Sequence, residues 1–217
     1  MKVDEKPTDP VVYISIDCEA TGPVPGLYNL VSIGAVPVVP EGNRHRVMED
    51  VLYLEFKPEF PGFQREAMRI HGITRRHLEK EGVEAKEGMT TLRKWALGWR
   101  TTKRTQLVFV GHNAPFDWSF ISYYFTYTKV RNPFGYKALD TKSLAMGKLD
   151  IPWLMTNKDV LSKHLSDLGS EDKGAKHRAD YDARYQARLL AGLLDYRKTA
   201  PARASKRKAS KRRGAGE

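Results

Sequence analysis

The chain has 217 residues, of which 41% are hydrophobic and 29% are charged. This mixture is typical of one globular domain with a real core and excludes a collagen or a coiled coil. No apolar run approaches the roughly 20 residues that cross a bilayer, so we expect no membrane association. Cys18 is the single cysteine, which excludes an intramolecular disulfide. It favours an intracellular location, either cytoplasmic and nucleoid-associated or, in a eukaryote, nuclear.

The net charge of +11 is concentrated at one end of the sequence. Residues 197–217 carry nine lysines and arginines and one acid, so eight of the eleven net charges lie there. The segment lacks the apolar residues needed to fold, and we expect a disordered basic tail after a domain at 11–196 and an N-terminal extension at 1–10. The tail suits an arm that binds the nucleic-acid backbone. A nuclear-import-like signal and a solubilising terminus are the alternatives.

Hydrophobic patterns predict strands in the first half of the chain and alternating strands and helices afterwards. In chain order, we predict strands at 11–17, 30–39, 47–57, 106–110 and 136–140. We predict helices at 92–99, 115–124, 160–168 and 178–196. Asn113 is the predicted N-cap of the second helix. This order favours an α/β sheet flanked by helices.

Two carboxylates stand at the end of the first predicted strand. Side chains at i and i+2 of a strand share a face, so Asp17 and Glu19 project together while Cys18 points away. Their mutual repulsion would be relieved by a hard divalent cation such as Mg²⁺, which prefers oxygen ligands. Taken alone, the pair is better explained as a solvated strand end.

Further acids and a histidine follow at two other places. Asp117 comes soon after an apolar strand, among aromatic residues, where a charge needs a partner or a metal. A helix-terminal acid favoured by the helix dipole is the alternative. His177 enters the last helix after a stretch at 169–176 that we expect to be mobile, and Asp182 lies within that helix. A neutral histidine there can accept a proton from water, although an exposed histidine in a basic loop would look the same.

Taken together, these three fragments form an ordered set of motifs. The order Asp17-x-Glu19, then His112-Asn113-x-x-x-Asp117, then His177-x-Ala-x-x-Asp182 resembles the motifs of the DEDDh 3′–5′ exonucleases. That family includes polymerase proofreading subunits and ribonuclease T. The resemblance covers most of residues 11–196 and extends to short segments such as Ala-Thr-Gly at 20–22 and Ile-His-Gly at 70–72.

The resemblance implies a fold, a chemistry and a catalytic set. The fold would be a ribonuclease-H-like mixed sheet, with the first three strands antiparallel and the rest parallel, flanked by helices. The metal ligands would be four carboxylates that hold two Mg²⁺ or Mn²⁺ ions: Asp17, Glu19, Asp117 and Asp182. His177 would be the general base. The enzyme would release nucleoside 5′-monophosphates from single-stranded or frayed 3′ ends of DNA or RNA by two-metal hydrolysis.

The resemblance also implies substrate contacts at Thr21, Gly22, Glu66, His71, Asn113 and Phe116. Thr21 and Gly22 would lie near the 3′ hydroxyl, and Glu66 and His71 near the terminal nucleotide. The last two could instead form an ordinary helix-to-loop junction. Phe116 could stack on a base or pack on Phe120.

Three alternatives concern partners. A polymerase could bind the chain as its proofreading subunit, the chain could form a homodimer, or the fold could serve as a non-catalytic nucleic-acid-binding module. The complete set of four acids and a histidine argues against the last.

Overall fold

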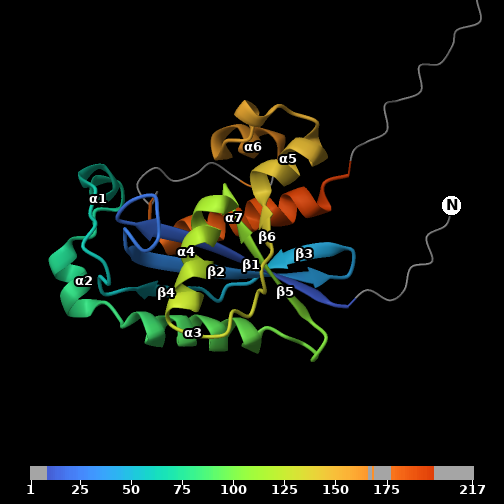
Figure 1. The fold of residues 1–217 in the computed structure, drawn as a ribbon. Helices are drawn as coiled ribbons and strands as arrows, with labels where there is room; N and C mark the ends of the chain where they lie inside the picture. The colour runs from blue at the N-terminus through green and yellow to red at the C-terminus, as the bar shows by residue number, and fades with distance from the viewer. Residues whose placement is uncertain (1–8, 166–167, 169–176, 198–217) are drawn as a thin grey trace, which may run out of the picture.

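The computed structural model describes residues 9–165, 168 and 177–197 (Figure 1). The predicted N-terminal extension, the stretch at 169–176 and the basic tail therefore lie outside the described residues, apart from residues 9, 10 and 197.

Six strands in the described part of the chain form one mixed sheet. They are β1 (Val11–Ala20), β2 (Leu30–Glu41), β3 (Arg44–Val47), β4 (Leu52–Glu55), β5 (Gln106–Gly111) and β6 (Ala138–Asp140). The order across the sheet is β3-β2-β1-β5-β6, and β4 also pairs with β2. β2 runs antiparallel to β1, β3 and β4, whereas β5 is parallel to both β1 and β6. The predicted change from antiparallel to parallel pairing is confirmed.

The prediction of one continuous strand at 47–57 is wrong. β3 ends at Val47, and β4 begins only at Leu52. Between them the chain leaves the sheet, where Glu49 accepts hydrogen bonds from Arg184 and the Asp50 carboxylate accepts one from the Trp95 indole at 2.9 Å. These side-chain contacts replace the ladder that a continuous strand would form.

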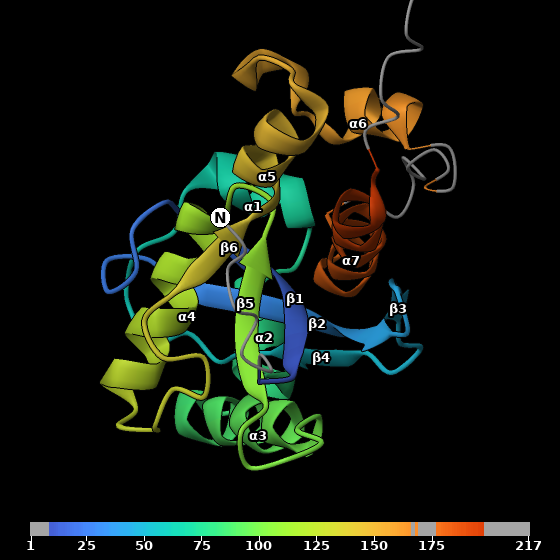
Figure 2. The same cartoon turned by 90° about the vertical axis from the view of Figure 1, so that its right-hand side faces the viewer.

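The helices cover both faces of the sheet. They are α1 (Arg65–His71), α2 (Arg75–Glu81), α3 (Ala85–Gly98), α4 (Ala114–Tyr127), α5 (Thr141–Leu149), the 3₁₀ turn η1 (Trp153–Met155), α6 (Lys158–His164) and α7 (Ala179–Asp195). α4 and α7 lie on opposite sides of the sheet (Figure 2). The sequence patterns missed α1, α2 and α5, and the helix predicted at 160–168 spans 158–164 instead. No described helix is long and apolar enough to cross a membrane.

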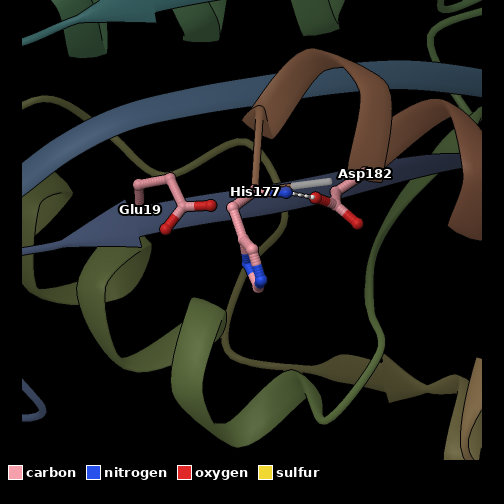
Figure 3. Close-up of side chains that lie close together, drawn as sticks. All are labelled: Glu19, His177 and Asp182. Carbon is pink, nitrogen blue, oxygen red and sulfur yellow. Dashed lines mark hydrogen bonds between the residues drawn. The ribbon is translucent and has the colours of Figure 1, made fainter. Parts of the chain in front are cut away.

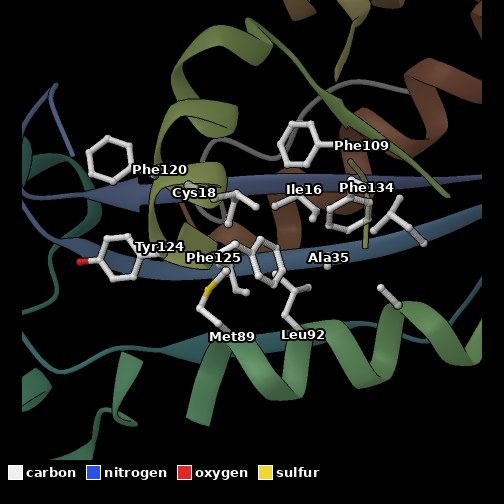
Figure 4. Packing of buried hydrophobic residues seen from close by; sticks show 14 of the residues in the cluster. Ile16, Cys18, Ala35, Met89, Leu92, Phe109, Phe120, Tyr124, Phe125 and Phe134 are labelled. Atoms are coloured by element: carbon white, nitrogen blue, oxygen red, sulfur yellow. The ribbon is translucent and has the colours of Figure 1, made fainter. Parts of the chain in front are cut away.

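Alternation along β1 decides which side chains enter the core. Ile14, Ile16 and Cys18 are buried on one face against α3 and α4 (Figure 4). The other face packs against α7, where Val36 and Val38 of β2 join the apolar stripe of that helix. Because the period of a strand is two, Asp17 and Glu19 are excluded from the α3–α4 core.

α4 begins differently from the prediction. Asn113 occupies the N-cap position, but its φ is 72° and its side chain makes no capping hydrogen bond. Asp140, at the end of β6, takes over this role: its carboxylate accepts from the Ala114 N–H at 2.8 Å and from the Ser143 N–H at 2.7 Å. One acid therefore caps both α4 and α5 and fixes them at the same edge of the sheet.

Candidate active site

The end of β1 and the first turns of α4 and α7 converge on one small cavity. It has a volume of about 260 Å³ and is lined by Asp17, Cys18, Glu19, His112, Asn113, Phe116, Asp117, Lys158, His177 and Asp182. The structure thus brings together the four predicted metal ligands and the predicted general base, which come from three distant parts of the sequence.

A glycine in β2 allows α7 to approach β1. Gly34 pairs with Asp17 in the ladder, and a Cβ at Gly34 would lie 2.0 Å from the carbonyl oxygen of Ala179. The first turn of α7 therefore rests directly on the sheet backbone. The Ser15 hydroxyl, on the same side of the sheet, donates to the Ala183 carbonyl at 2.9 Å. This close packing places Asp182 beside the end of β1.

Gln186, a fully buried residue of α7, ties the elements of the site to one another. Its side-chain amide donates to the Ile16 carbonyl at 2.7 Å and accepts from the His112 N–H at 2.9 Å. The His112 ring lies 2.9 Å from the Thr141 hydroxyl, and burial lowers its pKa to about 4, with the charges of Lys158 and Lys142 adding to the effect. A neutral His112 therefore supports the loop that leads into α4.

The carboxylates of the cavity repel one another. Burial raises the pKa of Glu19 to about 9, and the charges of Asp17 and Asp182 add to this effect. Asp117 is only 5% exposed, and burial raises its pKa to about 8 even though its carboxylate accepts the Cys18 N–H at 2.9 Å. Burial and neighbouring acids therefore disfavour the charged forms of both side chains when no cation is bound.

His177 is an exposed residue of the cavity lining, and its side chain lies near those of Glu19 and Asp182 (Figure 3). Its backbone has a φ of 66°, and its backbone N–H donates to the Asp182 carboxylate at 2.8 Å. One side-chain atom each of Glu19, His177 and Asp182 lies within 4.8 Å of the others. The imidazole and two of the acids can therefore share a bound group.

Comparisons with known proteins agree with this geometry. A family model described as Exonuclease (RNase_T) matches residues 14–190. The chain is 36% identical over 188 residues to the 3′–5′ DNA exonuclease Cap18 of Escherichia coli, covering 87% of this chain and 94% of the relative. The chain belongs to the DEDDh family of 3′–5′ exonucleases.

Structural relatives show the same fold. The nuclease domain of 3′hExo, a DEDDh member bound to rAMP, matches with a TM-score of 0.65 at 16% identity over 88% of this chain and 94% of that one. Exonuclease I of Escherichia coli, in complex with a dA16 oligonucleotide, matches with a TM-score of 0.62 at 18% identity over 86% of this chain and 42% of that one. The fold is thus ribonuclease-H-like, and the chain is a 3′–5′ exonuclease that acts on nucleic acid.

DEDDh exonucleases depend on divalent metal ions, and the donor set of this cavity fits them. All four carboxylates offer the oxygen ligands that hard cations prefer. The one thiol beside them, Cys18, is buried and packs in the main core. A bound divalent cation would also oppose the effects of burial and neighbouring acids that raise the pKa values of Glu19 and Asp117.

Lys158 is the cavity residue that the sequence analysis missed. Its ammonium lies 2.5 Å from the Asp182 carboxylate, and its side chain is only 16% exposed. The residue is the first of α6, and the burial of its charge results from how that helix docks near α7. A single lysine in a polar stretch gives no local signal, so only the structure reveals it.

The predicted substrate-binding residues are placed unequally. Asn113 and Phe116 line the cavity, and the Phe116 ring also packs on Phe120 with centroids 5.4 Å apart. Thr21 is buried and lies outside the lining, with its hydroxyl donating to the Gly62 carbonyl at 2.7 Å. A Cβ at Gly22 would lie 2.4 Å from the ring of Tyr28, so that glycine permits close loop packing.

Glu66 and His71 on α1 also lie outside the lining of the cavity. Glu66 is exposed. His71 accepts the Ile73 N–H at its Nδ1, and its Nε2 is buried without a hydrogen-bond partner among the described residues. Burial lowers the pKa of His71, and the nearby His177 lowers it further. His71 is thus close enough to the site to interact with the general-base candidate.

Proposed function

We propose that the chain removes nucleoside 5′-monophosphates one at a time from single-stranded or frayed 3′ ends of DNA by two-metal hydrolysis. The observation that carries the proposal is the convergence of four carboxylates and His177 on a single cavity. The name of the 36% identical relative, a DNA exonuclease, favours DNA over RNA. Association with a polymerase, or a homodimer, stays a prediction.

In this proposal Asp17, Glu19, Asp117 and Asp182 would hold the metal ions. When bound, divalent cations activate water for attack and neutralise charge that develops on the phosphate. The chain fixes the ligands beforehand: Asp117 is held by the Cys18 N–H and Asp182 by the His177 N–H. Rigid ligands spare the enzyme a rearrangement during the reaction.

His177 accepts the proton of the attacking water at its imidazole. Its position supports this role, because an exposed ring in the lining of the cavity can reach the water and pass the proton on to solvent. The size of the cavity, about 260 Å³, supports the choice of substrate. A space just below the usual range for small-ligand pockets suits no more than one terminal nucleotide, so a base pair would have to open first.

The test is an incubation with single-stranded DNA and RNA of the same sequence, labelled at the 5′ end. Metal-dependent shortening from the 3′ end, faster on DNA, is the expected result. Asp17→Asn should reduce the rate more than about 100-fold, because even residues that only orient ligands contribute ~10–100-fold. Asp159→Asn is the matched control, since this exposed acid of α6 lies outside the cavity.

Two results would contradict the proposal. One is an Asp17→Asn protein as active as the Asp159→Asn protein with Mg²⁺ present, which would remove the acids from the chemistry. The other is undiminished shortening in the presence of EDTA. Faster shortening of RNA would overturn the preference for DNA while leaving the reaction in place.

A further inference from the structure

Large apolar side chains are exposed between α5 and α6. The turn η1 carries Trp153, Leu154 and Met155 with exposed fractions of 44%, 82% and 44%. Met146 of α5 is 37% exposed. We call these four residues, together with Lys142, the α5–α6 platform. A cluster of this kind on a surface indicates a binding function more strongly than single exposed apolar residues do.

A lysine is part of the same surface. The Lys142 ammonium lies 4.8 Å from the centroid of the Trp153 ring, within the range of a cation–π contact. Lys142 and Met146 are one turn apart on α5 and therefore share a face of that helix. The indole is thus held beside a positive charge while much of its surface stays accessible.

Side-chain contacts connect the platform with the acidic cavity. The Lys142 ammonium donates to the Asn157 side chain at 3.4 Å. The next residue, Lys158, reaches the Asp182 carboxylate at 2.5 Å. Trp153 is joined to the same segment through its carbonyl, which accepts from the Thr156 hydroxyl at 2.6 Å. The platform therefore begins next to the cavity, within reach of a strand whose 3′ end lies among the carboxylates.

The chemistry of the platform matches a single strand of nucleic acid. Such strands are bound by aromatic rings, on which bases of any sequence stack, and by cations that contact phosphates. The platform offers the Trp153 ring, a flexible apolar surround, and the two lysines Lys142 and Lys158 along its path to the cavity.

We propose that the α5–α6 platform binds the nucleotides immediately upstream of the 3′-terminal one, with Trp153 stacked on a base and Lys142 beside a phosphate. This inference rests on the proposed function, because it gives the substrate strand a path away from the site. It assigns Trp153 a role in binding and none in the chemical step.

The test compares two substrates. One is a single-stranded oligodeoxynucleotide, and the other is the p-nitrophenyl ester of thymidine 5′-monophosphate, which has no upstream nucleotide. Trp153→Ala should raise the KM for the oligonucleotide roughly 5- to 100-fold, as expected for loss of one stacking contact, and leave the KM and kcat for the ester unchanged. Trp153→Phe should restore most of the affinity, because a smaller aromatic ring still stacks.

Tyr127→Ala is the matched control. Tyr127 is 45% exposed, almost the same as Trp153, but lies at the C-terminal end of α4, whereas Asp117 is in the first turn. We expect this variant to change neither KM. An effect on the oligonucleotide as large as that of Trp153→Ala would show a general response to lost surface aromatics and overturn the assignment.

The other outcomes separate the two proposals. An unchanged KM for the oligonucleotide in Trp153→Ala overturns the proposal that the platform binds the strand. An equal loss on both substrates also overturns it, because Trp153 would then act by stabilising the fold or the active site. If the wild-type protein hydrolyses neither substrate with Mg²⁺, the proposed function fails as well. Normal hydrolysis of the ester shows that only the platform is in question.

Discussion

The two ends of α7 carry aspartates in opposite surroundings. Asp182, at the N-terminal end, lies in the acidic cavity with Glu19 and Asp117. Asp195, at the C-terminal end, accepts hydrogen bonds from the backbone N–H and the ring of His45 at 3.0 and 2.7 Å. It borders a cavity of about 650 Å³, more than twice the size of the acidic one.

The acids at the two ends of α7 also differ in the direction in which the fold shifts their pKa values. Burial raises the pKa values of Glu19 and Asp117 at one end. At the other end burial also acts to raise the pKa of Asp195, but the hydrogen bonds from His45 and the charge of Arg44 outweigh it and lower that pKa. The acid at the larger cavity is stabilised in its charged form by hydrogen bonds, whereas the acids of the smaller cavity are destabilised in their charged forms. The raised pKa values, more than volume, identify the site.

The largest expected effect compares these two aspartates directly. Asp182→Asn should reduce exonuclease activity more than about 100-fold, because it removes a proposed metal ligand, while Asp195→Asn should stay within about twofold of the wild type. The measurement is the initial rate of nucleotide release at saturating Mg²⁺. Circular dichroism of both variants serves as the control for folding. Equal losses in the two variants would remove the distinction between the ends of α7.

A smaller effect concerns metal and pH. The folded state raises the pKa of Glu19 from 4.5 to about 9, so it binds this proton more tightly than the unfolded state does. The metal-free protein should therefore lose stability as the pH rises through that window. If Mg²⁺ binds the proposed ligands, it should relieve the repulsion, and its stabilising effect should grow over the same range, reaching roughly 5–10 °C in Tm at a hundredfold excess over its Kd.

Thermal melting with Mg²⁺ and with EDTA across this pH range checks the prediction. Asp195 should change stability with pH in the opposite direction, because its pKa is lower in the folded state. Its contribution to stability is present above the pKa of the unfolded state and is lost as the pH falls. A Mg²⁺ effect that is constant or shrinks toward high pH would contradict the description of the cavity.

The smallest expected effect concerns the contact that positions the active end of α7. Gly34→Ala places a Cβ 2.0 Å from the Ala179 carbonyl and should cost about 1–3 kcal/mol of folding free energy by overpacking. Gly98→Ala is the control, since a Cβ at the end of α3 meets nothing within 4 Å, and it should leave Tm unchanged or slightly higher. Urea unfolding of both variants measures the difference, and equal stabilities would show that α7 does not need the glycine.

Local features of the structure could be predicted from the sequence. Alternation along β1 predicts both the buried face and the joint projection of Asp17 and Glu19, because each depends only on the period of a strand. The approach of Asp117 and Asp182 is not local, and the resemblance to a family predicted it. α1 was missed because none of its residues is buried, so it has no apolar stripe to detect.

Contacts between elements that are distant in the chain could not be predicted from the sequence. The cap of α4 comes from Asp140 on another strand, so the local expectation for the Asn113 side chain was wrong. Lys158 reaches Asp182 only because α6 docks near α7. Both are single polar residues with no pattern around them, and their partners are chosen by packing.

The most direct test of the central claim is the location of bound metal. Crystals grown with Mn²⁺ and a nucleoside 5′-monophosphate would show the ions by their anomalous scattering. We predict two peaks in the acidic cavity, each within ligand distance of carboxylates from the set Asp17, Glu19, Asp117 and Asp182. Mn²⁺ bound elsewhere, with these four carboxylates left without a shared ion, would contradict it.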